Sequence, residues 1–209
     1  MKKVNHRRIP KQARGLQRYE RILDAAANLF SENGFEVTTT NEIAARAGTS
    51  IGSVYQYFGN KEAIVAALST RYVSALRDVT ETVLGAGVND LGTAAAADRL
   101  LDPIIAFHAQ HPEFRLLWLG TELSDTLKSA MKDMDDEVVG RVERLLEARA
   151  PRISHERAHV VVTAMHLALK ALLALIGRPE NAGFKDRVAA EVKHMLTAYI
   201  DEVIREQEG

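Results

Sequence analysis

The chain contains no cysteine among its 209 residues, which excludes disulfide bonds and metal sites built from thiolates. It also lacks an apolar run near its start, where the sequence MKKVNHRRIPKQARG is polar and basic. This start does not have the apolar segment of a signal peptide. From these two absences we expect a cytoplasmic protein.

No apolar run is long enough for a comfortable membrane span. The longest, residues 160–176, also contains His166 and Lys170, whereas a spanning helix needs about 20 mainly apolar residues. We therefore interpret this run as a buried helix. With 46% hydrophobic residues the chain has enough apolar material for a packed core, and its length suits one or two domains.

The net charge is only −1, but it is unevenly distributed. Residues 1–18 hold seven basic residues and no acidic one, which leaves a net charge of −8 on the rest of the chain. A basic arm of this kind could enter a DNA minor groove or follow phosphates. A solvated tail is an equally simple interpretation.

Residues 38–62, TTTNEIAARAGTSIGSVYQYFGNKE, have the pattern of two short helices joined by a tight turn. Thr39 and Glu42 have the spacing of a capping box, in which a hydroxyl and a carboxylate satisfy free amides at a helix start. This predicts a first helix over residues 40–47. The pattern as a whole predicts a helix-turn-helix.

The turn and the second helix follow from the next residues. Gly48 supplies the left-handed backbone conformation that ends the first helix. Thr49 and Ser50 offer oxygens that cap a second helix, over residues 51–58. The apolar positions predicted to hold the pair together are Ile43, Ala44, Ala47, Val54 and Phe58.

The other face of the second helix carries small, hydroxyl and amide side chains with few charges. Such side chains suit a helix in a DNA major groove, because hydroxyls and amides bind base edges or phosphates and glycine permits close approach. The residues on this face are Ile51, Gly52, Ser53, Gln56 and Tyr57, with Lys61 just beyond it.

At these residues the sequence resembles the TetR/AcrR family of bacterial transcriptional regulators. The resemblance covers residues 18–62 through four runs, and it is specific because aromatic, glycine and capping positions all agree at once. Two positions depart from the family pattern: Thr49 stands where an apolar residue is usual, and Tyr57 stands where histidine is frequent. The four runs are A-x-x-L-F-x-x-x-G-F at 26–35, T-T-x-x-I-A-x-x-A-G at 39–48, S-x-G-S-V-Y-x-Y-F at 50–58 and N-K-E at 60–62.

The resemblance implies a role for each residue that matches the motif. Base edges would be approached by the small and amide residues of the second helix, and phosphates would be held by hydroxyl and basic side chains around it. For Tyr55 the alternative is a ring that is mainly part of the core. The implied base contacts are Ile51, Gly52, Ser53 and Gln56, and the implied phosphate contacts are Thr40, Ser50, Tyr55, Tyr57 and Lys61.

We predict a basic arm over residues 1–17, a helix-turn-helix DNA-binding domain over 18–62, and a helical effector-binding and dimerisation domain over 63–209. Phe35 and Val37 are expected in the core of the first domain. Further helices are predicted at 16–33, 60–84, up to 109 with a kink or restart at Pro103, 113–119, 122–148, 155–176 and 184–206.

The last two helices are predicted to form a homodimer interface. The helix over 155–176 is apolar on most sides, and the helix over 184–206 has a wide apolar stripe, so both need more cover than a short chain provides. The resemblance implies the same four-helix interface. Burial within one subunit is the alternative.

The resemblance also implies a small-molecule effector, of unknown identity, bound inside the larger domain. Aromatic, methionine and polar residues on its helices are candidates for the pocket. The simpler interpretation of each is core filling. The candidate pocket residues are Phe107, His108, Phe114, Trp118, Glu122, Met134 and His166.

His155, Glu156 and His159 fit the H-E-x-x-H spacing, which places two imidazoles around zinc with glutamate as a base. The metzincin continuation fails because Met165 stands where histidine is required. A zinc-dependent metallopeptidase, or a zinc site shared with His166, is therefore kept only as an alternative. Ordinary helix-surface histidines are the preferred interpretation, and no metal, other cofactor or enzymatic activity is predicted.

Taken together, the sequence predicts an all-α protein that binds a palindromic operator in double-stranded DNA as a homodimer, without a membrane. We expect a ligand-responsive transcriptional regulator that acts most simply as a repressor, by blocking polymerase. Ligand binding would move the helix over 60–84 and change the separation of the two recognition helices.

Overall fold

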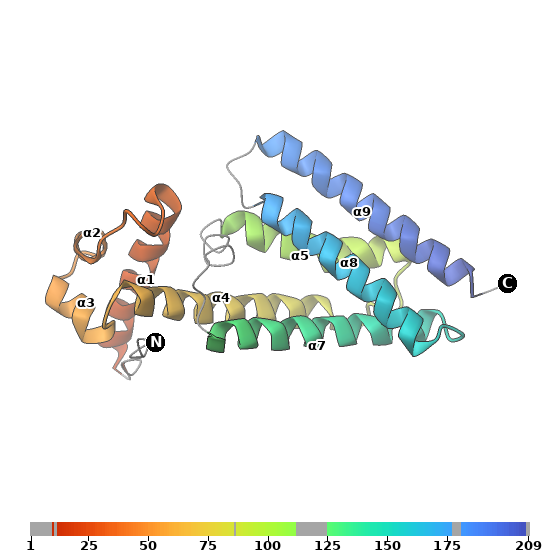
Figure 1. The fold of residues 1–209 in the computed structure, drawn as a ribbon, viewed down its shortest axis with the longest axis horizontal. Helices are drawn as coiled ribbons and strands as arrows, with labels where there is room; N and C mark the ends of the chain where they lie inside the picture. Colours follow the sequence, from red (N-terminus) through yellow and green to blue (C-terminus); the bar gives the residue numbers. More distant parts are fainter. Residues whose placement is uncertain (1–9, 11, 86, 112–124, 177–180, 208–209) are drawn as a thin grey trace. The chain divides into compact units, whose positions relative to one another are not determined.

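The computed structural model describes residues 10, 12–85, 87–111, 125–176 and 181–207, and almost all of its regular structure is α-helical, as predicted (Figure 1). The helices are α1 (Ala13–Asn33), α2 (Thr40–Arg46), α3 (Ile51–Tyr57), α4 (Lys61–Val83), α5 (Thr93–Gln110), α7 (Asp125–Arg149), α8 (His155–Ile176) and α9 (Ala182–Arg205). The helix expected at 113–119 lies outside the described residues.

The described chain divides into two compact units within α4. The first contains the residues up to Val73 and the start of α7 up to Lys128, and the second contains the residues from Ser74 onwards without that start. The domain boundary expected after residue 62 remains a prediction, because helix α4 continues across it.

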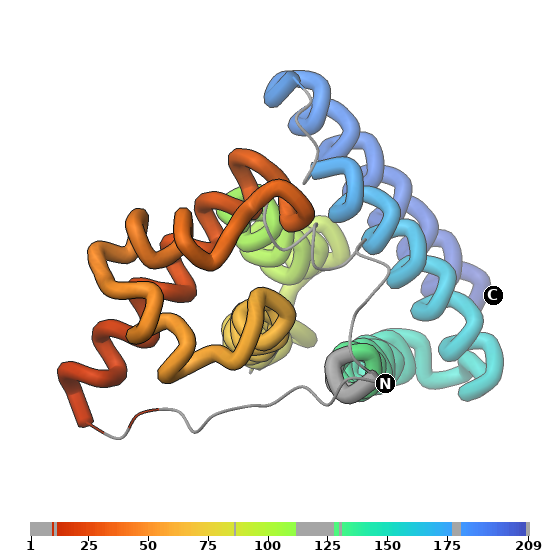
Figure 2. Tube along the Cα trace, turned by 60° about the vertical axis from the view of Figure 1, so that its left-hand side comes forward, coloured from red at the N-terminus to blue at the C-terminus, as the bar shows by residue number. Residues whose placement is uncertain are grey.

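The core of the first unit forms where α1 packs against α2, and α2 against α3 (Figure 2). The apolar residues of α1 recur every three or four positions, so they lie on one side of the helix. That side is buried as the spacing predicts. Its members Ile22, Leu23, Ala26, Leu29 and Phe30 are all at most 4% exposed.

The link between α1 and α2 differs from the expectation for Val37. Val37 is 70% exposed, whereas Thr38 is 1% exposed. The Thr38 hydroxyl donates to Gly34 O at 2.8 Å, so its polar atom is satisfied inside the protein. Phe35 is half-buried, with its ring 5.5 Å from that of Phe30. Val37 was therefore predicted wrongly, because a hydrogen-bonded threonine occupies the inward position next to it.

In the second unit, α5 packs against α8 and α9, and α8 packs against α9 along its length (Figure 1). A cluster of buried side chains joins the end of α7 to the start of α8 and to α9. Helices α8 and α9 have close to the predicted bounds. The cluster consists of Leu146, Ala150, Ile153, Ala158, Val161, Val162 and Val203.

Helix α5 runs without interruption through Pro103, where the sequence predicted a kink or a restart. Proline removes one backbone hydrogen bond from a helix interior. The buried Ala96 and Phe107 lie on either side of it along the helix. The helix is therefore continuous rather than kinked or restarted, and it is packed against its neighbours both before and after Pro103.

Helix α8 is long and apolar enough to cross a membrane, a test that the core helix of a soluble protein also passes. In the structure its residues Ala158, Val161, Val162, Leu172 and Ile176 are buried against the rest of the second unit. One side of α8 is therefore buried, as predicted for a core helix. The opposite side of α8 is exposed.

Candidate nucleic-acid interface and ligand cavity

The start of α2 has the capping box that the sequence predicts. Thr39 Oγ1 accepts a hydrogen bond from the Glu42 amide at 3.2 Å, and Glu42 Oε2 accepts one from the Thr39 amide at 2.7 Å. The hydrogen bonds that the Thr39 amide and hydroxyl donate to the Glu42 carboxylate also lower the pKa of that carboxyl below its usual range. The carboxylate at the first turn of α2 additionally suits the positive end of the helix dipole.

The turn between α2 and α3 depends on Gly48, which has a φ of +60°. This is the left-handed region that glycine adopts without strain. The next amide, of Thr49, donates to Ala44 O at 3.0 Å, and Ser50 Oγ accepts from the Ser53 amide at 3.1 Å. The turn therefore ends one helix and caps the next within four residues.

Beneath this turn an apolar core fixes α3 on α1 and α2. Ile43 and Val54 are fully buried, and Phe58 is 3% exposed. The ring of Phe58 stacks on Tyr19 of α1 at 4.8 Å, and the Tyr57 ring meets Tyr19 edge-on at 6.1 Å. Aromatic pairs of this kind hold α3 in one orientation.

The face of α3 opposite this core is open to solvent. Most of the predicted DNA contacts lie on it, and Tyr55 O–H lies 3.3 Å from the Thr40 hydroxyl, so two implied phosphate contacts are adjacent. The Tyr55 side chain is 45% exposed, so its ring is not mainly core. Of the predicted contacts, Ser50, Ile51, Gly52, Tyr55 and Gln56 are exposed, and Thr40, Ser53, Tyr57 and Lys61 are half-buried.

Lys61 makes contacts that the sequence did not predict. Its Nζ donates to the backbone oxygens of Phe35, Glu36 and Thr38 at 2.5, 3.2 and 2.9 Å, and lies 4.1 Å from the centre of the Phe35 ring. An ammonium group has three donors, so all three are used on the link between α1 and α2. A phosphate contact by Lys61 stays a prediction, and in this structure the side chain braces that link.

Most of the basic arm lies outside the described residues, but two of its arginines are on α1. Arg14 and Arg18 are exposed there. At Gly15, an added Cβ would lie 2.9 Å from Pro10 and 3.7 Å from the Tyr57 hydroxyl. Glycine at this position thus lets Pro10 approach α1 beside Tyr57, which is one of the predicted phosphate contacts.

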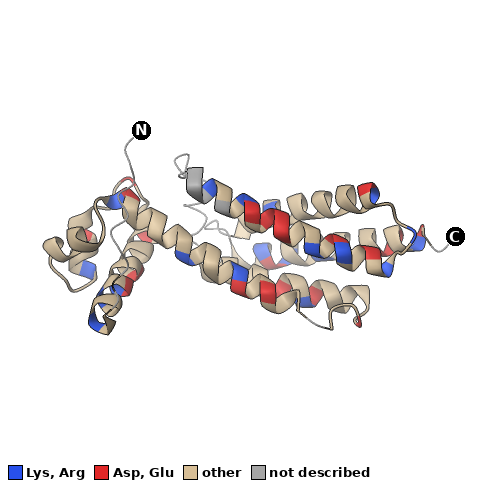
Figure 3. Ribbon diagram, turned by 90° about the horizontal axis from the view of Figure 1, so that it is seen from below, with Lys and Arg blue, Asp and Glu red and all other residues tan. Residues whose placement is uncertain are grey.

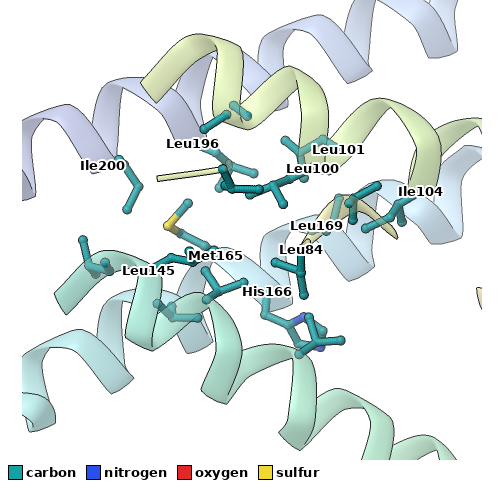
Figure 4. Close-up of a pocket in the computed structure, with 18 of the residues that line it drawn as sticks. Leu84, Leu100, Leu101, Ile104, Leu145, Met165, His166, Leu169, Leu196 and Ile200 are labelled. Atoms are coloured by element: carbon teal, nitrogen blue, oxygen red, sulfur yellow. The ribbon is translucent and has the colours of Figure 1, made fainter. Parts of the chain in front are cut away.

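The second unit contains a cavity of about 150 Å³ whose wall is formed by α4, α5, α7, α8 and α9 (Figure 4). In Figure 4 the labelled aliphatic side chains of these helices point toward one another around the space. The wall is almost entirely aliphatic. Its polar members are Thr80, Thr93, Arg149, His166 and Thr197.

The cavity contains one of the seven predicted pocket residues, His166. Phe107, His108 and Met134 are buried but do not line it. The Phe107 ring instead packs against His111 at 4.6 Å. Phe114, Trp118 and Glu122 lie outside the described residues. An effector contact by these residues stays a prediction, and the leucine, isoleucine and valine residues that form the wall carry no distinctive sequence signal.

His166 lies beside two charged groups. Its Nε2 is 3.3 Å from Asp135 Oδ1, and Lys170 Nζ is 2.5 Å from Asp135 Oδ2. Burial by itself would raise the pKa of the Asp135 carboxyl, but the interactions with His166 and Lys170 outweigh it and lower that pKa. The carboxylate therefore keeps its negative charge between the His166 ring and the Lys170 ammonium.

The two histidines of the H-E-x-x-H run each have a carboxylate partner on α7. His155 Nδ1 lies 2.9 Å from Glu147 Oε1, and His159 Nδ1 lies 2.6 Å from Glu143 Oε1. The interaction with Glu147 raises the pKa of His155. Within the described part of the chain no group of three histidine, aspartate or glutamate side chains is placed to hold a metal ion.

Two family models match the chain. The model described as "Bacterial regulatory proteins, tetR family" matches residues 22–68, which include α2, α3 and most of α1. The model described as "Tetracyclin repressor-like, C-terminal domain" matches residues 93–200. The second match alone covers more than half of the chain.

Curated relatives match over shorter stretches. The HTH-type regulator YdgC of Bacillus subtilis is 35% identical over 124 residues, which are 59% of this chain and 63% of that protein. The A-factor receptor protein of Streptomyces griseus is 39% identical over 68 residues, or 32% of this chain and 25% of that protein. The chain thus spans less than two thirds of the length of these relatives.

Solved structures are similar over almost the whole chain. A TetR-like transcriptional regulator from Rhodococcus sp. RHA1 has a TM-score of 0.68 and 20% identity, with 95% of this chain and 99% of that chain covered. A TetR-family regulator from Streptomyces coelicolor has a TM-score of 0.59 and 29% identity, with 90% and 97% covered. From these matches, and from the capped helix pair and helical second unit described above, the chain belongs to the TetR family of bacterial regulatory proteins.

Proposed function

We propose that the protein binds double-stranded DNA through α3 and regulates transcription, as a repressor that blocks polymerase. The observation that carries this proposal is the exposed face of α3 above a fully buried Val54. A helix held rigidly from one side, with small and amide side chains on the other, suits the major groove. The relatives named as regulators and as the repressor KstR2 support this reading.

Within this proposal the contacts divide into two kinds. Ile51, Gly52, Ser53 and Gln56 approach base edges, whereas Thr40, Ser50, Tyr55, Tyr57 and Lys61 hold phosphates. The adjacent hydroxyls of Tyr55 and Thr40 support a phosphate site at the side of α3. The basic arm would add phosphate or minor-groove contacts close to Tyr57.

The protein acts as a homodimer in this proposal, and the interface is formed by α8 and α9. Helix α8 exposes an apolar stripe at positions 160, 164, 167 and 171, where Val160 is 53% and Leu167 is 61% exposed. From Ala158 to Leu169 the helix has no acidic or basic residue other than two histidines, and most of α8 is free of charge in Figure 3. Helix α9 exposes Met195 and Tyr199.

Such a patch supports a contact with a second copy, because soluble monomers rarely leave contiguous apolar surface open. A symmetric contact pairs the same patch on both subunits. Two recognition helices would then meet half-sites about 34 Å apart on a palindrome.

The protein also responds to a ligand in this proposal. A small molecule bound in the cavity shifts the protein between two states that differ in their affinity for DNA. The protein works in the cytoplasm and is not an enzyme.

The DNA-binding proposal is tested by selecting bound fragments from random duplexes and then measuring variants on them. Gln56→Ala should relax preference at particular base pairs, at a cost of about 1 to 3 kcal/mol on the selected site. Tyr57→Phe should weaken binding to selected and random duplexes alike. Equal losses on every sequence for both variants would refute the division of roles, and no enrichment would refute DNA binding.

The dimer is tested by placing a charge in the α8 stripe. Leu167→Glu should convert the protein to a monomer in light scattering and weaken binding to a palindrome far more than to a single half-site. The exposed Arg144 on α7 provides the control, Arg144→Glu, which should remain dimeric. If Leu167→Glu stays a dimer, the interface lies elsewhere.

A further inference from the structure

The cavity extends along two of its helices, α5 and α7. Its wall follows α5 from Thr93 to Ile104 and α7 from Val138 to Arg149. Each stretch advances by eleven residues, which is about 16 Å at 1.5 Å per residue. In Figure 4, Ile104 and Leu169 lie toward one end of the space, and Leu145 and Ile200 toward the other. A cavity of about 150 Å³ spread over this length suits a linear ligand better than a ring system.

The hydroxyl groups of the wall are largely satisfied within their own helices. Thr80 Oγ1 donates to Leu76 O at 2.8 Å, and Thr197 Oγ1 donates to Lys193 O at 2.8 Å. His166 Nε2 lies 3.3 Å from Asp135 Oδ1 but is buried without a hydrogen bond, and Asp135 already accepts from Lys170. A ligand therefore meets mainly aliphatic side chains, and burial of aliphatic groups is the main source of its binding energy.

Arg149 carries the permanent charge of the wall. Its Nη2 donates to the backbone oxygens of Val88 and Leu91, at 2.6 and 2.8 Å. Both partners are neutral, and among the described residues Arg149 has no ion pair with a carboxylate. In the same structure Arg71 pairs with two carboxylates and Arg141 with one. A guanidinium has five N–H donors, so Arg149 has donors and a full positive charge left for a ligand.

We infer that the effector is a linear aliphatic carboxylate, with its chain along α5 and α7 and its carboxylate on Arg149. This inference deepens the proposed ligand response and depends on it. A half-buried positive charge beside an apolar channel is stabilised by an anion, because buried charges are normally paired. The carbonyls of Val88 and Leu91 orient the guanidinium, so that the remaining N–H groups are presented in a fixed direction.

The test compares head groups on one chain length. Binding of octanoate, 1-octanol and octylamine to the unaltered protein is measured by calorimetry in the absence of DNA. Octanoate should bind about ten- to a hundredfold more tightly than octanol, and octylamine most weakly. From hexanoate to octanoate the affinity should rise roughly fourfold per methylene. This series needs no variant, so a folding defect cannot obscure it.

Variants locate the head group. Arg149→Gln should remove the preference for octanoate over octanol while octanol affinity changes less than about twofold, and Arg149→Lys should keep most of the preference. Arg144→Gln, on the exposed side of α7, is the matched control and should bind like the unaltered protein. Leu100→Trp should fill the channel and abolish binding of both ligands.

Three outcomes overturn the inference. The first is that octanol binds as tightly as octanoate or more tightly. The second is that Arg149→Gln loses both ligands to the same degree, which would show that Arg149 only braces the loop at Val88 and Leu91. If none of the three compounds binds, the ligand class is wrong. The selection of DNA fragments is independent of these measurements, so DNA binding can stand when the ligand inference fails.

Discussion

The two units of this protein are stabilised in different ways. In the first, short-range features specify the structure: the Thr39 and Glu42 capping box, the left-handed Gly48 and the Ser50 cap act within a few residues. In the second, long helices pack through aliphatic side chains and leave a cavity of about 150 Å³ between them. The exposed face of α3 is thus packed tightly from below, whereas the helices of the second unit leave apolar space unfilled.

Matched core truncations give the largest expected effect and test this difference directly. Ile22→Ala and Leu169→Ala remove the same number of carbon atoms, but Ile22 is fully buried in the first unit and Leu169 lines the cavity. We expect Ile22→Ala to lower the free energy of unfolding by about 2 to 5 kcal/mol and Leu169→Ala by roughly half as much. Urea denaturation measures both. Equal losses would show that the cavity wall is packed as tightly as the first unit.

The pH dependence of the free energy of unfolding tests how tightly the second unit is packed around His108. Burial, with a smaller contribution from His111, lowers the pKa of His108 to about 4. Because the unfolded chain takes up this proton near pH 6.5 and the folded chain does not, stability should fall as the pH drops from 6.5 toward 4. The loss is at most about 3 kcal/mol. His108→Gln should flatten this part of the stability curve.

His155 provides the control of opposite sign for that titration. Its pKa is raised by Glu147, so its contribution to stability is present below pH 6.5 and is lost as the pH rises through its folded pKa. His155→Gln should therefore leave the acid-side loss in place. If the free energy of unfolding of His108→Gln still falls by the same amount between pH 6.5 and 4, then another group causes this loss of stability.

A substitution of Lys61 should give the smallest of these changes in stability. It tests whether the first unit is stabilised by short-range features alone. Lys61→Met removes the bonds to the carbonyls of Phe35, Glu36 and Thr38. We expect a loss of about 2 kcal/mol in stability, with weaker binding to all DNA sequences. Arg21→Met, on the exposed side of α1, should change stability little. Unchanged stability would show that these bonds do not brace the link, and an unchanged salt dependence of DNA binding would refute the phosphate contact of Lys61.

Much of the first unit could be predicted because its signals are local. The capping box, the turn at Gly48 and the buried face of α1 each involve residues close in sequence, and all three are confirmed. Val37 was wrong because the choice between Val37 and Thr38 depends on hydrogen bonds that the folded link offers to Thr38. The DNA contacts themselves stay predictions. The structure shows that the face of α3 on which most of them lie is exposed.

The position of the cavity could not be predicted, for a physical reason. Aromatic, histidine and methionine residues were chosen by type, but a cavity is set by which sides of five helices converge, and among the described members of that set His166 alone lines it. Arg149 carried no signal in the sequence, because an arginine near a helix end is ordinary there. Its position at the cavity and its neutral partners became evident only with the helices in place.

The sequence by itself determined the helices, their caps and the recognition turn, because hydrophobic spacing and backbone conformation act over a few residues. Tertiary structure alone decided where apolar space stays unfilled, which arginine lies at its wall, and which side of α8 remains uncovered. These depend on contacts between residues far apart along the chain, such as Arg149 with Val88 and Leu91, and no local pattern encodes them.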